Sequence, residues 1–347
     1  MNNQLGTADI RIFTGVLVAI FIAIAVFALV KLDTTGEKGS GLGQAYVYDI
    51  EELAETDPNL ILYEESAEAI STGFSAARGI AVDSRGRIYV AGDKSVNVFS
   101  DSGDLQSEIE LTAMPRCLAV ADDGRIYIGI EDHVEVYGLE GKRAAVWAGL
   151  GEDVVLTSIA VSNNDVFVAD AGNRVVVHYD SDGKLLNYIG RKNEDRNIPG
   201  FVIPSPYFDL AVGSDGLLRV VNPGRHRIEA YTFDGDLEFW WGEFSARVEG
   251  FTGCCNPVNF AMLQDDSFVT CEKGLVRVKI YNADGSFAGL VAGPEQLVRG
   301  GASHVCKLPA ECQAGGFDVA VAKLGRILVL DTIKNSVRIF ARKKTEQ

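Results

Sequence analysis

The sequence lacks the short motifs that accompany several common chemistries. It contains no G-x-S-x-G, no H-E-x-x-H and no phosphate-binding Walker loop. These absences argue against a hydrolase built on a nucleophile elbow, a zinc protease and a P-loop nucleotide-binding protein. The Asp-Gly pairs are typical of hairpin turns, and none has the loop length and terminal glutamate of a calcium hand.

Positive charge is also scarce. Lys and Arg number 32 against 48 Asp and Glu, for a net charge of −16. The first forty residues sum to zero, so the whole excess belongs to the rest of the chain. Such a surface repels phosphate backbones, and no basic stripe with interleaved aromatic residues is present. We therefore expect no nucleic-acid binding, and a cationic or neutral partner.

Long apolar runs are missing with one exception. Ile12–Val30 is nineteen residues without a charge, and as a helix it would span about 28 Å, close to the hydrocarbon core of a bilayer. The run exceeds the ~7–15 residues of a signal-peptide core. We predict a short cytoplasmic tail (1–11), one transmembrane helix (12–30), a linker (31–58) and one large domain (59–347). A short tail before a large acidic domain favours a periplasmic or extracellular location for that domain.

The chain does contain an internal repeat. Each copy holds three short apolar runs separated by turn residues, and five copies continue into a fourth run after a glycine turn. The first runs share an alanine followed by an apolar residue: Ala81, Ala119, Ala160, Ala211, Ala261 and Ala320. These alanines lie 38 to 59 residues apart, which fits one four-stranded blade per copy. Six copies predict an all-β, six-bladed β-propeller.

The sixth copy has no fourth run, because the sequence ends soon after its third. An unassigned apolar segment, Asn59–Ser66, precedes the first copy. If this segment pairs with the sixth blade, no blade keeps a bare edge. We therefore predict that an N-terminal strand closes the ring.

Residues 170–180 (D-A-G-N-R-V-V-V-H-Y-D) and 331–340 (D-T-I-K-N-S-V-R-I-F) resemble NHL repeats. The resemblance covers roughly residues 60–345 and implies a six-bladed propeller. It implies no single activity, since NHL propellers and their relatives include interaction modules, RNA binders, an amidating lyase and lactonase-like hydrolases. Residues 250–257 (G-F-T-G-C-C-N-P) are similar to a subgroup of bacterial, membrane-anchored NHL-type proteins, which implies a role for Cys254 and Cys255.

The cysteines are concentrated late in the chain. Five of the six lie within the fifth repeat and its connection to the sixth: Cys254, Cys255, Cys271, Cys306 and Cys312. Because hairpins alternate between the two faces of an antiparallel sheet, the strand order sends these five and Cys117 toward one rim. The long loops 191–206, 243–257 and 293–315 lie on the same rim.

Three interpretations of these cysteines stay open. In an oxidising compartment, one disulfide could close the loop between the last two cysteines, and another could join Cys271 to the vicinal pair. Alternatively, thiolates among the five, with His304 as a substitute ligand, could hold zinc or an iron–sulfur cluster, although no C-x-x-C pair is present. Inert buried thiols are the third interpretation, which suits Cys117 best.

Other polar and aromatic residues have plainer interpretations. Aspartates that end second strands, such as Asp170 and Asp331, are expected to cap the turn that follows. His178 alternates with apolar residues in a third strand and is expected on a blade surface. Trp240 and Trp241 are adjacent in a fourth strand, so their rings must point to opposite sides and one indole is expected to be exposed.

Together these patterns predict a membrane-anchored binding platform, not an enzyme, that takes a protein or small-molecule partner at its loop-rich rim. One alternative is a redox or electron-transfer protein with a metal or iron–sulfur centre on the clustered cysteines. Another is a metal-dependent hydrolase or lyase of the lactonase or amidating-lyase type, with metal ligands converging on the central channel. Its candidate ligands are His226 and the strand-end residues Asp170, Asn222, Glu272 and Asp331.

Overall fold

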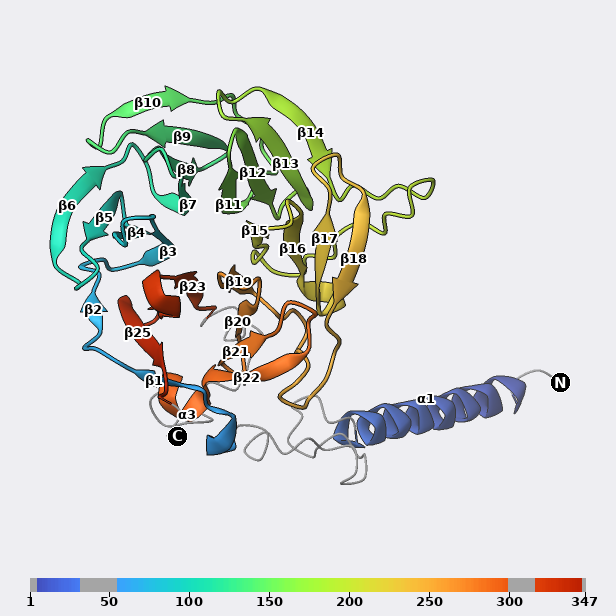
Figure 1. Ribbon diagram of the computed structural model, residues 1–347. Coiled ribbons are helices and arrows are strands. Elements are labelled where there is room, and N and C mark those ends of the chain that lie inside the picture. Colours follow the sequence, from blue (N-terminus) through green and yellow to red (C-terminus); the bar gives the residue numbers. More distant parts are fainter. Residues whose placement is uncertain (1–4, 32–54, 299–315, 345–347) are drawn as a thin grey trace. The chain divides into compact units, whose positions relative to one another are not determined.

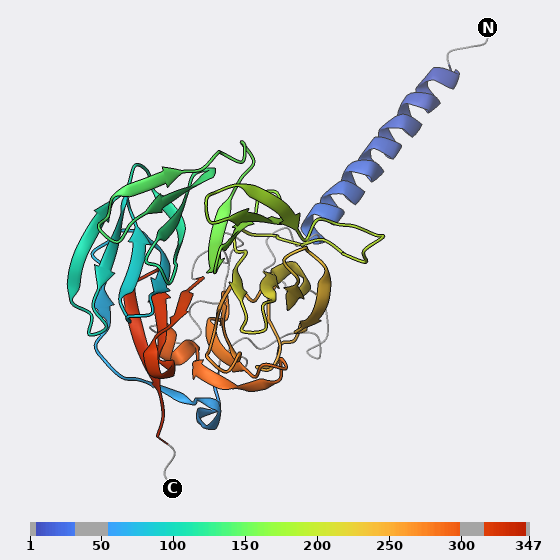
Figure 2. The same ribbon diagram turned by 45° about the horizontal axis from the view of Figure 1, so that its top comes forward.

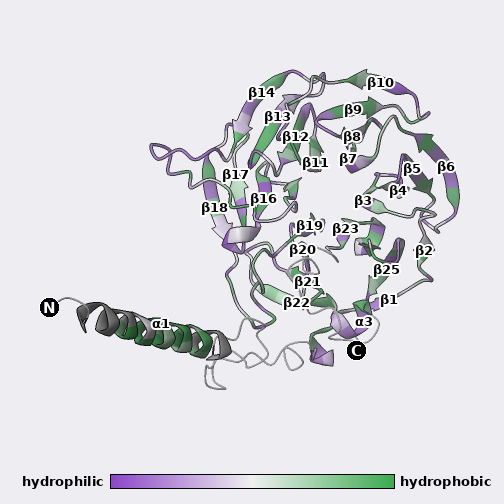
Figure 3. Cartoon of the chain, turned by 180° about the vertical axis from the view of Figure 1, so that it is seen from behind, coloured by the Kyte–Doolittle hydropathy of each residue, from purple (hydrophilic) through white to green (hydrophobic). Residues whose placement is uncertain are grey.

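The computed structural model describes residues 5–31, 55–298 and 316–344. The chain divides into two units, Met1–Asp49 and Ile50–Gln347. In the first unit, helix α1 (Leu5–Lys31) has exposed side chains over residues 12–27, and Figure 3 colours its middle as hydrophobic. In the described parts of the chain, no helix is long and apolar enough to cross a membrane. The transmembrane span at residues 12–30 therefore stays a prediction.

The second unit consists of six antiparallel sheets, the blades (Figure 1). Blade one contains β3 (Ala77–Val82), β4 (Ile88–Gly92), β5 (Ser95–Phe99) and β6 (Leu105–Glu110). Blade two contains β7 (Pro115–Val120), β8 (Ile126–Ile130), β9 (His133–Tyr137) and β10 (Arg143–Val146). Blade three contains β11 (Leu156–Ser162), β12 (Asp165–Asp170), β13 (Val175–Asp180) and β14 (Leu185–Ile189).

The later blades follow the same order with longer connections. Blade four contains β15 (Leu210–Val212), β16 (Leu218–Asn222), β17 (Arg227–Tyr231) and β18 (Leu237–Trp241), with a short helix η3 (Pro223–Arg225). Blade five contains β19 (Asn259–Met262), β20 (Phe268–Glu272), β21 (Arg277–Tyr281) and β22 (Phe287–Ala292), followed by α3 (Pro294–Leu297). Blade six contains β23 (Asp318–Val321), η6 (Lys323–Gly325), β24 (Ile327–Asp331) and β25 (Ser336–Arg342).

The first strands of the six blades form the inner wall of a ring. β3 contacts β7, and the contacts continue through β11, β15, β19 and β23 back to β3. Figures 1 and 2 show these strands nearest the common axis, with the outermost strands such as β6 and β18 at the periphery. The six-bladed all-β propeller predicted from the repeat is confirmed.

Burial follows the position of a strand within its blade. The second strands β4 and β8 are buried along their whole length, whereas the outermost β6 is mostly exposed. The core lies between neighbouring blades: Trp241 of blade four packs against Phe268 and Tyr281 of blade five, with ring centroids 4.7 and 4.8 Å away. Trp241 is 8% exposed and Trp240 is 53% exposed, so the predicted opposition of the two indoles is confirmed.

Blade six takes its outer strand from the start of the unit. β1 (Tyr63–Glu65), which follows helix η2 (Pro58–Leu60), pairs antiparallel with β25, and β2 (Ile70–Ser71) pairs with the same strand further along. Arg338 of β25 donates from Nε and Nη2 to the two carboxylate oxygens of Glu65, at 2.9 and 2.7 Å. The pairing of β1 lies within residues 59–66, the segment from which a borrowed strand was predicted, whereas β2 lies after that segment.

Candidate functional site

A cavity of about 1050 Å³ lies on the axis of the ring. Equivalent positions in all six blades, two residues before the repeated alanine, line it: Gly79, Cys117, Ser158, Asp209, Asn259 and Asp318. The cavity also touches loop residues on the rim where the long connections lie, among them Ser75, Met114, Pro206 and Tyr207. We call this cavity the axial pocket.

Two aspartates of the axial pocket tie neighbouring blades together. Asp209 accepts the backbone N–H of Leu210 through Oδ1 (2.8 Å) and that of Phe260 in the next blade through Oδ2 (2.7 Å). Asp318 does the same between blades six and one, accepting from Ile80 (2.9 Å) and from the residue that follows Asp318 itself (2.8 Å). Each carboxylate therefore bridges two inner strands, one oxygen to each.

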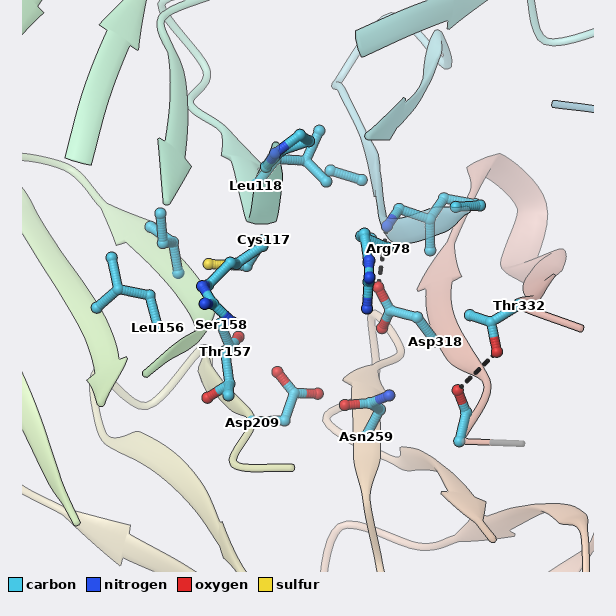
Figure 4. Close-up of a pocket in the computed structure, with 18 of the residues that line it drawn as sticks. Arg78, Cys117, Leu118, Leu156, Thr157, Ser158, Asp209, Asn259, Asp318 and Thr332 are labelled. Atoms are coloured by element: carbon cyan, nitrogen blue, oxygen red, sulfur yellow. Dashed lines mark hydrogen bonds between the residues drawn. The ribbon is translucent and has the colours of Figure 1, made fainter. Parts of the chain in front are cut away.

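The same carboxyl groups face the pocket. Figure 4 shows Asp209, Asn259 and Asp318 turned toward its interior from three different blades. Burial raises the pKa of both aspartates, and the negative charge of Asp209 raises the pKa of Asp318 further. A carboxylate has about four lone-pair positions; the backbone N–H groups occupy two on each aspartate, and the Ser158 hydroxyl occupies a third on Asp209. The remaining positions can accept hydrogen bonds from a bound group and stabilise a positive charge; Arg78 and Arg116 also line the pocket.

The described residues contain no group of three or more His, Cys, Asp or Glu side chains placed to hold a metal ion. The strand-end residues proposed as ligands bond to nearby backbone instead. Asp170 accepts from the N–H groups of Gly172 (3.1 Å) and Asn173 (3.2 Å), and Asp331 accepts from the N–H of Ile333 (3.0 Å). Turn capping by these two aspartates is confirmed.

The histidines lie away from the axial pocket as far as the structure describes them. The expectation that His178 lies on a blade surface is wrong, because its side chain is buried. Its Nε2 lies 2.6 Å from Asp165 Oδ1, its Nδ1 lies 3.0 Å from Asn187 Oδ1, and its ring stacks on Phe167. The neighbouring blade covers this face with Phe233, so alternation along the strand could not indicate exposure.

The structure describes four of the six cysteines, and all four are free thiols: Cys117, Cys254, Cys255 and Cys271. Cys306, Cys312 and His304 lie outside the described residues. Burial raises the pKa of Cys117 to about 12 and that of Cys271 well above the usual range. Such thiols are poor nucleophiles, which supports the inert interpretation for these two. A metal or disulfide site on all five late cysteines stays a prediction.

The vicinal cysteines occupy a different environment. Their Sγ atoms lie 3.2 Å apart, and Cys254 is exposed whereas Cys255 is 2% exposed. Beside them, Lys273 Nζ donates to Ser205 Oγ at 3.0 Å and lies 4.7 Å from the ring centre of Tyr207. Both Lys273 and Ser205 are buried. We call this group of residues the dithiol corner.

The sequence around the corner explains its shape. Gly253 has φ +78°, a conformation that glycine adopts without steric cost. Asn256 then fixes the loop: its Nδ2 donates to the carbonyls of Thr252 (2.7 Å) and Lys273 (2.9 Å), and its Oδ1 accepts the Lys273 N–H (2.9 Å). The G-C-C-N-P loop is therefore tied to the end of β20, which places Cys255 beside Lys273.

The surroundings shift the pKa values of the two thiols of the corner in opposite directions. Burial would raise the pKa of Cys255, but hydrogen bonds from Ser205 and Cys254 together with the Lys273 ammonium lower it overall. The hydrogen bond to Cys255 raises the pKa of Cys254. Either sulfur can donate the hydrogen bond between them, and the pair titrates as a coupled unit in which the lower pKa belongs to Cys255.

Buried charges hold the long loop that precedes the corner. Lys279 and Glu272 are fully buried and lie 3.1 Å apart, and Lys279 Nζ also donates to the carbonyls of Val248 (3.1 Å) and Gly250 (2.6 Å). Burial lowers the pKa of Lys279 to about 8. This network was not predicted from the sequence, since a lysine in a strand is usually solvated.

A signal for such buried polar residues was present in the repeat. Each third strand has an aromatic residue at or near its end, and two residues before it five of the six blades carry a polar side chain: Asn97, Glu135, Glu229, Lys279 and Arg338. All five are buried. A polar residue recurring at one position of an otherwise apolar strand indicates a paired interior group.

Comparison with known proteins supports the fold alone. No family model matches the chain, and no curated protein matches it. A streptogramin B lyase structure is 14% identical, with a TM-score of 0.56 over 80% of this chain and 97% of that one. Virginiamycin B lyase from Staphylococcus aureus is 15% identical, with a TM-score of 0.51 over 82% of this chain and 90% of that one.

A WD40 propeller domain, that of Doa1, is also similar in structure, at 17% identity and a TM-score of 0.50 over 77% of this chain and 79% of that domain. At these identities the neighbours establish a six-bladed β-propeller and not an activity. The resemblance to NHL repeats stays a prediction.

Proposed function

We propose that this protein is a binding propeller whose axial pocket takes a positively charged group of a small molecule or a protein side chain. The observation that carries the proposal is the pair Asp209 and Asp318, whose carboxyl groups face the pocket. Propellers commonly present ligands at one end of the ring. The acidic net charge of −16 would also attract a cationic partner.

The pocket lies where the long loops converge, which fits a rim that recognises a partner. Pro206 and Tyr207 end the loop before blade four, and Gly316 lies just before blade six. Loops on a rigid scaffold are the usual carriers of binding function. Large partners would contact these loops and insert one cationic side chain into the axial pocket.

Nα-acetyl-lysine amide is a suitable probe, with Nα-acetyl-norleucine amide as the uncharged control. Calorimetry should detect saturable binding of the first and not the second. Asp209→Asn and Asp318→Asn should each weaken binding about tenfold, the loss of one charged hydrogen bond. Asp234→Asn, in an exposed turn of blade four, should have no effect. Equal binding of both probes, or binding that survives both pocket variants, would contradict the proposal.

A second candidate function is a hydrolase or lyase reaction in the same pocket. It is favoured by the raised pKa of both buried carboxyl groups, since acids and bases used in catalysis often have such shifts. Several solved structures that are similar in fold are named as streptogramin B or virginiamycin B lyases. Incubation with virginiamycin B tests this directly by mass spectrometry: a lyase product keeps the mass of the substrate and a hydrolase product gains one water. An unchanged substrate would remove this candidate.

We also propose that residues 12–30 anchor the propeller to a membrane, with the propeller on the periplasmic or extracellular side. The support is the charge-free run of nineteen residues in the sequence, close to the ~20 residues needed to span a bilayer. Fractionation of cells that express the full chain should place it with membranes, and a chain that starts at residue 50 should be released. Equal release of both would contradict the anchor.

A further inference from the structure

We propose that Cys254 and Cys255 form a redox-active dithiol that exchanges with external disulfides and closes into a disulfide between the two neighbouring residues. This inference does not depend on the axial pocket. Its starting point is the distance of 3.2 Å between the two sulfurs, beyond the ~2.05 Å of a disulfide bond but close enough for one sulfur to attack the other.

The two thiols have the complementary accessibility that an exchange reaction requires. Cys254 is exposed, so an external disulfide can approach its sulfur, whereas Cys255 is buried against Ser205 and Lys273. A mixed disulfide on Cys254 would therefore have a second thiolate directly beside it. Exposed, attacking cysteines paired with a nearby resolving thiol are the usual arrangement of dithiol exchange sites.

The position of Lys273 favours a reactive thiolate over a metal site at these two cysteines. Its buried ammonium donates to Ser205 Oγ and stabilises negative charge on Cys255. The lowered pKa of Cys255 agrees with this geometry and keeps the thiolate available at lower pH than an ordinary thiol. A cationic side chain next to the sulfur repels a metal cation but favours a thiolate. No cationic side chain lowers the pKa of Cys271. Arg116 is the one cationic side chain that lowers the pKa of Cys117.

The reaction balances without any group beyond the external disulfide. Cys254 transfers its proton to the Cys255 thiolate, and Cys254 Sγ then attacks one sulfur of the disulfide, whose other sulfur leaves as a thiolate. Cys255 passes the proton to the first leaving thiolate and attacks Cys254 Sγ, which expels the second thiolate. One S–S bond is broken and one is formed. From a Cys254 thiol and a Cys255 thiolate, the two cysteines lose two electrons and one proton, and the external disulfide becomes one thiol and one thiolate.

Oxidised glutathione is the probe for this reaction. The reduced full-length protein is incubated with it, quenched with iodoacetamide and digested with chymotrypsin, which releases residues 252–260 with only Cys254 and Cys255. We expect this peptide to be unalkylated, free of glutathione and lighter than the dithiol by two hydrogens. Cys255→Ser should stop the reaction at a glutathione adduct on Cys254. Cys271→Ala, which alters a buried thiol outside the corner, should leave the reaction unchanged.

Lys273 is tested as a positioning residue. Lys273→Met should slow the exchange at pH 7 about tenfold and move the pH of half-maximal alkylation upward by about one unit, and Lys273→Arg should restore both. A simple packing role would not move the pH profile.

Three results would overturn the proposal. The first is a peptide 252–260 that stays fully alkylated after incubation with oxidised glutathione. The second is a disulfide that joins either residue to Cys271. The third is zinc or iron that copurifies with the chain, disappears in Cys254→Ser and prevents the exchange, which would instead favour a metal site. Amine binding in the axial pocket is measured separately, so either proposal can fail alone.

Discussion

The axial pocket and the dithiol corner are built in opposite ways. In the pocket, Asp209 and Asp318 stand at equivalent positions of different blades, and each bonds to the backbone of the next inner strand. In the corner, Ser205, Cys255 and Lys273 come from two long connections and one strand end of blades four and five. Repetition around an axis assembles the first site, and departure from the repeat assembles the second.

The difference teaches that each site needs its own kind of support. A ring position is held by the neighbouring blade, since every blade meets the next in the same way. A loop that belongs to one blade has no such neighbour and must be tied down by local polar groups. Asn256 and Lys279 do this for the dithiol corner through five hydrogen bonds to nearby backbone.

The largest expected effect would test whether the corner depends on its buried ion pair. Lys279→Met should lower the free energy of unfolding by about 3–5 kcal/mol, because it leaves the Glu272 carboxylate buried without its closest cation. Urea denaturation measures this change, and hydrogen exchange should show faster opening of residues 248–251. Lys184→Met, at an exposed lysine in a hairpin of blade three, is the control. Equal stability of the two variants would show that the loop does not need the ion pair.

An intermediate effect would test the ring positions. Asp318→Ala should lower the free energy of unfolding by about 2–4 kcal/mol, because the buried N–H groups of Ile80 and Val319 both lose their acceptor. Asp318→Asn keeps one acceptor oxygen and should cost less. Asp234→Ala, at an exposed turn, should change little. If Asp318→Ala were as stable as the wild type, the carboxylate would not join blades six and one, and the contrast with the dithiol corner would fail.

The smallest effect concerns the strand at the edge of blade six. Arg338→Ala should lower the free energy of unfolding by about 1 kcal/mol, since the Arg338–Glu65 pair has two good hydrogen bonds but Glu65 is partly exposed. If β1 closes the ring, hydrogen exchange should also become faster in β1 and β25 together. Faster exchange in β1 alone would indicate that blade six is stable without β1 and that β1 does not close the ring.

Much of the fold could be predicted from the repeat. The alanine of each first strand, the aromatic residue at or near the end of each third strand and the turn glycines recur in all or most copies, and such local patterns report directly on strands and hairpins. The axial pocket could in principle also have been predicted from the sequence, since its polar residues lie at a constant offset from the repeated alanine. Neither Asp209 nor Asp318 was recognised, because an aspartate before a strand more often belongs to a turn.

The dithiol corner was predictable only in part. Cys254 and Cys255 were identified as functional candidates, but their partners Ser205 and Lys273 lie 49 and 19 residues from Cys254 and carry no motif. His178 failed for the same reason: its burial depends on Phe233 from the next blade. Contacts between blades are long-range, and alternation along one strand carries no information about them.

By itself the sequence determined the number of blades, their strand order and the concentration of cysteines in one sector, because these depend on local periodicity and on counting. The tertiary structure alone decided which polar groups face one another: the two carboxyl groups across the axial pocket, and the lysine and serine beside Cys255. Those contacts arise only when the ring brings distant segments within hydrogen-bonding distance, where burial makes each charge depend on its neighbours.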